Sequence, residues 1–166
     1  MIDNNPTLIY LDTNAYSRPF DDQTNMDIQA EANAFLEIIA EVKTGKLLLL
    51  GSDILDFEVY IVLNKEKRTK IKDYLSLCFQ HVENSADVLN LGKQVESNCH
   101  IRARDALHIA SAIIGQARYF ISCDKKVTEM KQARCYRRLA KPYRKEYFSA
   151  MNPVLFVEKM KKGEIE

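Results

Sequence analysis

Short apolar segments that alternate with helix-forming segments restrict the fold of this sequence more than any other feature. Buried strands are predicted for the apolar runs at residues 7–11, 46–50 and 119–123. Helical spacing and capping residues predict helices at residues 30–42, 52–63, 67–79, 87–99 and 105–116, and a closing helix from Asn152-Pro153. Apolar strands joined by helices form a parallel sheet with both faces covered, so we expect a three-layer α/β/α protein.

Length and composition predict one globular domain that spans residues 1–166. A chain of 166 residues with 46% hydrophobic and 28% charged residues can bury a core without disulfides or a structural metal. Its apolar runs are far shorter than the roughly 20 residues that span a bilayer. The N-terminus has no signal-peptide pattern. We therefore expect a cytoplasmic protein that makes no membrane contact.

The four cysteines are predicted to be structural residues. The spacings between Cys78, Cys99, Cys123 and Cys135 fit no zinc motif. Because thiols stay reduced in the cytosol, we expect all four to be free thiols.

Two aspartates directly follow predicted strands. Asp12 comes after the strand at residues 7–11, and Asp124 comes after the strand at residues 119–123. Ligands of parallel sheets bind beyond the carboxyl ends of the strands, so we expect both carboxylates at that edge. The alternative for either residue alone is a turn former or a helix N-cap.

Two further carboxylates lie in predicted helices. Eight of the ten residues from 54 to 63 are apolar, which places Glu58 on an apolar face where an unpaired carboxylate is costly. Asp105 begins a helix whose small residues allow close approach to the sheet. The alternatives are a salt bridge from Lys or Arg to Glu58, and a favourable charge at a helix N-terminus for Asp105. His108 is expected to be a core residue hydrogen-bonded to the backbone, with a general base as the alternative.

A pocket formed by these four acids predicts a divalent cation. Converging carboxylates repel one another, so such a pocket is stable mainly around a metal ion. Oxygen donors without a Cys or a nearby His pair favour Mg²⁺ or Mn²⁺ over zinc.

The same residues lie in motifs that resemble those of the PIN-domain family, which includes VapC-type toxins and RNA-processing enzymes. The motifs are Leu11-Asp12-Thr13-Asn14, Glu58 after the second strand, Arg104-Asp105-Ala106-Leu107-His108-Ile109-Ala110 and Ser122-Cys123-Asp124-Lys125-Lys126. The order and separations of the acids match, and the similarity runs from Leu8 to Asn152-Pro153-Val154. The resemblance implies a parallel sheet flanked by helices and a metal-dependent endonuclease, often acting on RNA.

The resemblance also assigns roles to single residues. Asp12 and Asp105 resemble the principal metal ligands, Glu58 and Asp124 complete the acidic pocket, and Asn14 resembles a polar residue that contacts a metal-bound water. The implied reaction is Mg²⁺- or Mn²⁺-dependent hydrolysis of RNA phosphodiesters. A toxin would require an antitoxin protein as partner, whereas a processing enzyme would not. Homodimers are frequent among the proteins that this chain resembles.

A basic segment follows the last acid. Residues 125–145 contain nine Lys or Arg and the single acid Glu129. With Arg102 and Arg104, this segment either binds the RNA backbone or forms a solvated helix face.

Three other functions fit parts of the pattern. A catalytically silent PIN-fold module that binds protein or RNA would not need all four acids. A phosphotransferase of the haloacid-dehalogenase type needs a second Asp two positions after Asp12, where this chain has Asn14. A receiver-like phosphoacceptor needs paired acids before the accepting Asp, and only Lys125 or Lys126 matches its later lysine.

Overall fold

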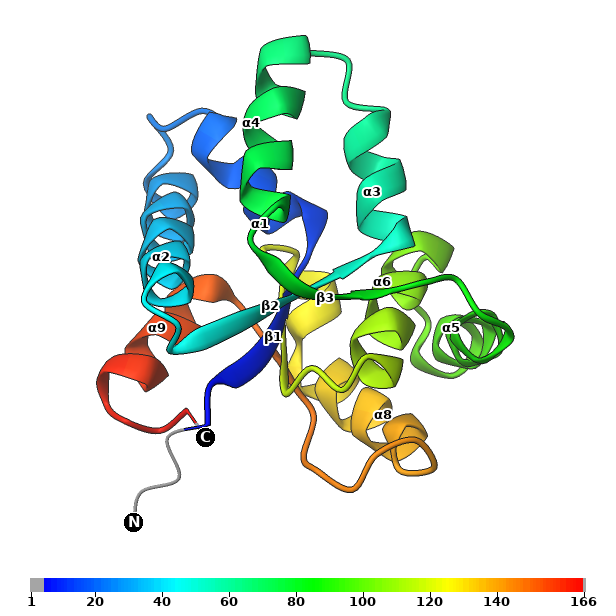
Figure 1. The fold of residues 1–166 in the computed structure, drawn as a ribbon. Coiled ribbons are helices and arrows are strands. Elements are labelled where there is room, and N and C mark those ends of the chain that lie inside the picture. Colours follow the sequence, from blue (N-terminus) through cyan, green and yellow to red (C-terminus); the bar gives the residue numbers. More distant parts are fainter. Residues whose placement is uncertain (1–4, 166) are drawn as a thin grey trace.

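The computed structural model describes residues 5–165 (Figure 1). Its strands are β1 (Thr7–Leu11), β2 (Leu47–Ser52), β3 (Cys78–Val82), β4 (Tyr119–Ile121) and β5 (Ser149–Met151). Its helices are α1 (Thr13–Ser17), the 3₁₀ helix η1 (Arg18–Phe20), α2 (Met26–Lys43), α3 (Asp53–Tyr60), α4 (Lys65–Leu75), α5 (Ala86–Cys99), α6 (Ala103–Ile114), α7 (Lys125–Thr128), α8 (Met130–Ala140) and α9 (Pro153–Lys161).

The five strands form one parallel sheet in the order β3-β2-β1-β4-β5. Helices α2 and α9 lie on one side of the strands, and α5, α6 and α8 lie on the other (Figure 1). The prediction of a three-layer α/β/α fold with a central parallel sheet is confirmed.

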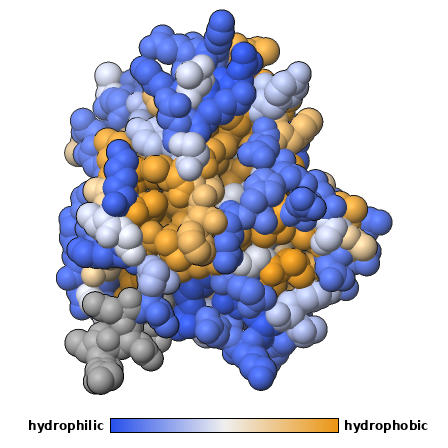
Figure 2. All heavy atoms as spheres, viewed as in Figure 1, coloured by the Kyte–Doolittle hydropathy of each residue, from blue (hydrophilic) through white to orange (hydrophobic). Residues whose placement is uncertain are grey.

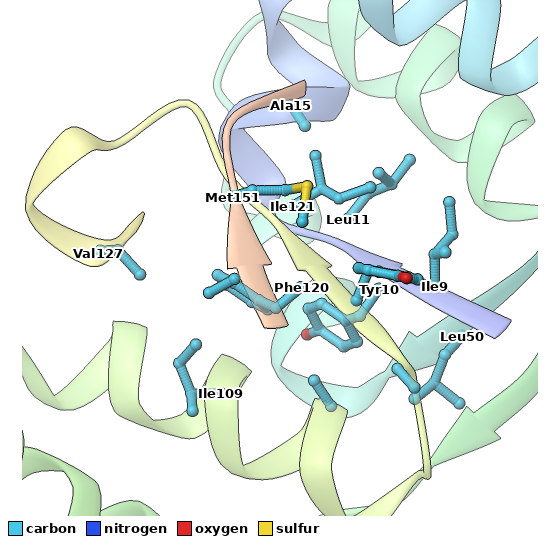
Figure 3. Packing of buried hydrophobic residues seen from close by; sticks show 14 of the residues in the cluster. Ile9, Tyr10, Leu11, Ala15, Leu50, Ile109, Phe120, Ile121, Val127 and Met151 are labelled. Carbon is cyan, nitrogen blue, oxygen red and sulfur yellow. The ribbon is translucent and has the colours of Figure 1, made fainter. Parts of the chain in front are cut away.

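The central strand β1 is apolar because helices cover both faces of the sheet. Tyr10 and Leu11 are fully buried, and the Tyr10 ring stacks on Phe120 of β4 with 5.6 Å between ring centroids. Figure 3 shows these side chains together with Ile109 of α6, which belongs to the helix layer. The same packing fixes the register of β1 and β4, in which Leu11 is paired with Ile121. The carboxyl ends of the two strands therefore lie side by side.

The predicted elements differ from the structure in several places. The helix expected at residues 67–79 ends at Leu75, and β3 follows it as a largely exposed edge strand. Strand β5 and helix α8 were not predicted. The segment expected to be a loop up to Asn25 contains α1 and η1. The strand expected at residues 119–123 ends at Ile121, so Asp124 lies three residues beyond it.

The prediction that all four cysteines are free thiols is wrong for two of them. Cys99, at the end of α5, and Cys135, in α8, form a disulfide with 5.8 Å between their Cα atoms. Cys78 and Cys123 are free. The pairing arises because α5 and α8 pack side by side. This contact joins segments 36 residues apart and cannot be inferred from cysteine spacing.

Apolar side chains gather over the middle of the face shown in Figure 2, around β2 and β3. Phe79 on the edge strand β3 is 62% exposed. Within residues 5–165, no helix has the length and apolar character needed to cross a membrane.

Gly115 is the glycine at which a side chain would meet the closest neighbours. It ends α6, and a Cβ there would lie 2.4 Å from Leu50 Cδ2 and 2.5 Å from Val82 Cγ2. Gly115→Ala should therefore lower the free energy of unfolding by about 1–3 kcal/mol, the usual cost of overpacking a core. Urea denaturation measures the change. Gly92→Ala is the matched control, because its nearest contact is 3.0 Å and alanine favours the helix. An equal effect of both substitutions would contradict the steric argument.

Candidate active site

Asp12 lies at the junction of β1 and β4. Its backbone N–H donates to the carbonyl of Ile121 at 2.9 Å, and its side chain is the N-cap of α1. Oδ1 accepts from the backbone N–H of Thr13 at 2.7 Å, and Oδ2 accepts from Asn14 Nδ2 at 3.1 Å and Ser122 Oγ at 2.8 Å. The carboxylate is 4% exposed. Asp12 is thus both the helix cap that the sequence allowed and a carboxylate at the predicted edge of the sheet.

Asn14 links the ends of the two strands. Its Nδ2 also donates to Ser122 Oγ at 2.9 Å, and its Oδ1 accepts from the backbone N–H of Cys123 at 2.9 Å. Both ends of the amide are therefore used to orient Asp12 and the segment after β4. Contact with a metal-bound water remains a prediction for this residue.

His108 connects Glu58 to the core. Its Nε2 lies 2.7 Å from Glu58 Oε1 and 3.7 Å from Asp12 Oδ1, and its Nδ1 lies 2.6 Å from the Tyr10 hydroxyl. His108 is buried as expected, but its hydrogen-bond partners are side chains and not the backbone. Among residues 5–165, the ion-pair partner of Glu58 is this histidine and not a Lys or Arg.

The buried charges shift one another's pKa. Burial raises the pKa of Glu58, but the hydrogen bond and charge of His108 outweigh it, so the net pKa is lowered. Burial lowers the pKa of His108, but the charges of Asp12 and Glu58 outweigh it, so the net pKa is raised. Burial also raises the pKa of Asp12, which His108 and Ser122 offset only in part and which repulsion from Asp105 and Glu58 increases. An added cation would relieve this repulsion.

Asp105 and Asp124 share one guanidinium group. Asp105 lies in the first turn of α6, and Asp124 is the N-cap of α7, where it accepts from the backbone N–H of Lys126 at 2.9 Å. Arg102 Nε lies 2.9 Å from Asp105 Oδ2, and an Arg102 terminal nitrogen lies 3.4 Å from Asp124 Oδ2. These groups line a pocket of about 500 Å³, formed by His100, Ile101, Arg102, Asp105, Asp124, Lys126, Val127, Glu129 and Gln132.

The four predicted acids gather around this edge of the sheet without forming a closed ligand set. Ser122 Oγ donates to Asp12 Oδ2 at 2.8 Å and accepts from the backbone N–H of Asp124 at 3.2 Å. Arg102 in turn joins Asp124 to Asp105, so these three acids lie in one neighbourhood. No three of the four acids have carboxylate oxygens that all lie within 4.8 Å of one another. Within the described part of the chain, only a different group of residues meets that criterion. The donors are all oxygens and two of them hold a cationic group, so they fit a hard divalent cation.

The other cluster consists of Asp53, Asp56 and His81. His81 Nε2 lies 2.7 Å from Asp53 Oδ1 and 3.9 Å from Asp56 Oδ2. Asp53 also accepts from the backbone N–H of Asn84 at 2.8 Å. This cluster was not predicted, because His81 lies on β3, where the sequence pattern indicates no strand.

Two residues that support the site were also missed. Ser122, which directly follows the neighbouring strand β4, donates to Asp12. The Tyr10 hydroxyl holds His108 and also contacts Ser52 Oγ at 2.7 Å. Ser122 carries one weak signal, its position two residues before Asp124. Tyr10 carries none, since it looks like any apolar strand residue.

The basic segment is only partly a solvated surface. On α8 buried residues recur at intervals of three and four positions, at Ala133, Tyr136 and Ala140, with cationic side chains between them. Arg144 is 8% exposed and donates to the carbonyls of Ala117 and Glu146, so its role is structural. Lys126 lines the acidic pocket.

The segment that contains these residues matches a known protein family. The model of the PIN domain matches residues 9–133, which include all four acids and Asn14. No curated protein matches the sequence. A chain in the crystal structure of VapBC2 from Rickettsia felis bound to a DNA fragment from their promoter superposes with a TM-score of 0.52 at 15% identity. The alignment covers 88% of this chain and 98% of that one, and at this identity it supports the fold alone. On the family match, which extends over most of its length, this chain belongs to the PIN domain family.

Proposed function

We propose that this protein is a metal-dependent endoribonuclease that hydrolyses RNA phosphodiester bonds at the acidic pocket. The observation that carries the proposal is the convergence of Asp12, Glu58, Asp105 and Asp124 beyond the carboxyl ends of β1 and β4. Open parallel sheets bind their ligands at this edge. Asp12 and Asp105 are the proposed principal ligands of Mg²⁺ or Mn²⁺, and Glu58 and Asp124 complete the pocket.

The side chains around the acids keep them in place. Ser122 and Asn14 fix the orientation of Asp12 with hydrogen bonds of 2.8 and 3.1 Å. The buried His108 fixes the orientation of Glu58 through a contact of 2.7 Å between Nε2 and Oε1. A bound divalent cation would activate water and neutralise negative charge on the phosphoryl oxygens.

The RNA is proposed to lie along the pocket that Arg102 and Lys126 line. Both side chains are cationic and can contact phosphates, which gives affinity that falls with salt and little choice of sequence. Because Arg144 is buried, the basic segment contributes through its exposed members only.

We propose further that the nuclease acts with a protein partner, as the toxin of a toxin-antitoxin pair. One structural neighbour belongs to a complex named VapBC2, which motivates the idea at the level of the fold. Exposed apolar side chains at Phe57, Tyr60 and Leu63, on and after α3, offer surface that a partner or a second copy would cover. Co-purification with the product of the neighbouring reading frame tests the antitoxin, and the mass in solution tests the homodimer.

The nuclease is tested with a fluorescent single-stranded RNA. We expect the protein to cut the RNA with Mg²⁺ or Mn²⁺ and not with EDTA, because uncompensated carboxylates cannot stabilise the charge that develops on phosphate. A single-stranded DNA of the same sequence tests the preference for RNA. Absence of cleavage with either metal, across several RNAs, would contradict the proposal and favour the catalytically silent interaction module.

A further inference from the structure

The acidic pocket already contains a cation supplied by the chain itself. Arg102 precedes α6 as its N-cap residue, but its side chain makes no cap hydrogen bond. It lines the pocket, where its guanidinium lies 2.9 Å from Asp105 and 3.4 Å from Asp124. These two carboxylates belong to different helices, α6 and α7. The guanidinium is therefore the group that links them.

This ion pair is open to exchange. The Arg102 side chain is 79% exposed, whereas the side chains of Asp105 and Asp124 are 14% and 27% exposed. The acids are fixed by their helices, and the arginine lies at the end of a flexible chain in solvent. An exposed ion pair of this kind stabilises a protein only weakly. A competing cation of higher charge density would displace the arginine and leave the acids in place.

We infer that Arg102 is a displaceable counter-ion of the acidic pocket, which competes with the divalent cation and moves aside when the metal binds. The inference rests on the proposed function, since it requires a metal at Asp105 and Asp124. In the metal-free protein Arg102 reduces the repulsion between the two carboxylates. Once displaced, its guanidinium stays at the mouth of the pocket, on the same wall as an incoming phosphate and close to Lys126.

Removal of this arginine should strengthen metal binding. Arg102→Gln should bind Mn²⁺ about three- to tenfold more tightly than the wild type, because the metal no longer has to break two exposed ion pairs. Arg102→Lys should fall between the two, since one ammonium group cannot reach both carboxylates as the planar guanidinium does. The difference should shrink at high salt, where exposed ion pairs are screened.

Lys126→Gln is the matched control. Lys126 lines the same pocket and carries the same charge, but its side chain makes no ion pair with Asp105 or Asp124 among those found in the described residues. Loss of the Lys126 charge therefore measures how one nearby positive charge, without an ion pair, affects Mn²⁺ affinity. We expect less than a twofold change in Mn²⁺ affinity for this variant.

The experiment is a titration of each purified protein with MnCl₂, in which the signal of free Mn²⁺ is followed by electron paramagnetic resonance. Thermal unfolding with and without Mn²⁺ gives a second readout, and the rise in Tm on adding metal should be largest for Arg102→Gln. Equal affinities of Arg102→Gln and Lys126→Gln, or weaker binding by Arg102→Gln, would overturn the inference while the metal site stands. A wild-type protein that binds no Mn²⁺ would overturn the proposed metal site together with it.

Discussion

Replacing Asp105 with asparagine should lower the rate of RNA cleavage by at least about a hundredfold and leave the fold intact. Loss of an outer partner of a metal site already costs roughly 10- to 100-fold in affinity or activity, and loss of a ligand costs more. Asparagine keeps the shape of the side chain but removes the charge that holds the cation. The rate is measured on the fluorescent RNA with Mn²⁺ in excess.

The stability of this variant should change by less than about 1 kcal/mol. Asp105→Asn loses the ion pair with the exposed Arg102, which is worth little. It also removes a negative charge that raises the pKa of the buried Asp12, so repulsion inside the pocket falls. The two effects oppose each other. Urea denaturation of the metal-free variant separates a chemical defect from an unfolded protein.

Asp56→Asn is the control for this experiment. Asp56 belongs to the second acidic cluster, its side chain is 63% exposed, and its closest histidine nitrogen lies 3.9 Å away. Cleavage should be unchanged in this variant. The reverse result, in which Asp56→Asn is inactive and Asp105→Asn is active, would transfer the catalytic site to Asp53, Asp56 and His81.

The sheet and the place of the acids could be predicted from the sequence because both depend on local pattern. An apolar run followed by a polar cluster marks the end of β1, and the sheet then brings Asp12 and the segment before Asp124 to one edge. Strand β3 has no such pattern, because it is an edge strand with exposed residues at Phe79 and His81. Its sequence is therefore as compatible with the end of a helix as with a strand.

The parts of the site that could not be predicted from the sequence depend on contacts between distant segments. The hydrogen bond between Tyr10 and His108 joins residues 98 positions apart, and the role of Ser122 depends on the neighbouring strand. Nothing in the local sequence around Tyr10 distinguishes it from a purely apolar core residue. The position of Arg102 between two acids likewise depends on how α6 and α7 meet.

Reduction of the disulfide should lower the free energy of unfolding by about 2–4 kcal/mol. Cys99 and Cys135 close a loop of 36 residues, for which loss of chain entropy in the unfolded state gives about 4 kcal/mol as the upper value. For a chain of this length, such a change corresponds to a fall in Tm of roughly 5–15 °C. Dithiothreitol should produce this fall in the wild type and no further fall in Cys135→Ser. Cys78→Ser, which removes a free cysteine, should respond to the reductant as the wild type does.

The effect should extend to the acidic pocket, since the disulfide ties together two of its walls. Three pocket-lining residues, His100, Ile101 and Arg102, directly follow Cys99. A fourth, Gln132, lies about one helical turn before Cys135. Without the bond, α8 is held to α5 by packing alone, and its basic face can move away from the acids. A count of free thiols in the protein unfolded without a reductant provides the decisive check. Four reactive thiols and a Tm that ignores dithiothreitol would mean that these cysteines are reduced, as expected for a cytosolic protein.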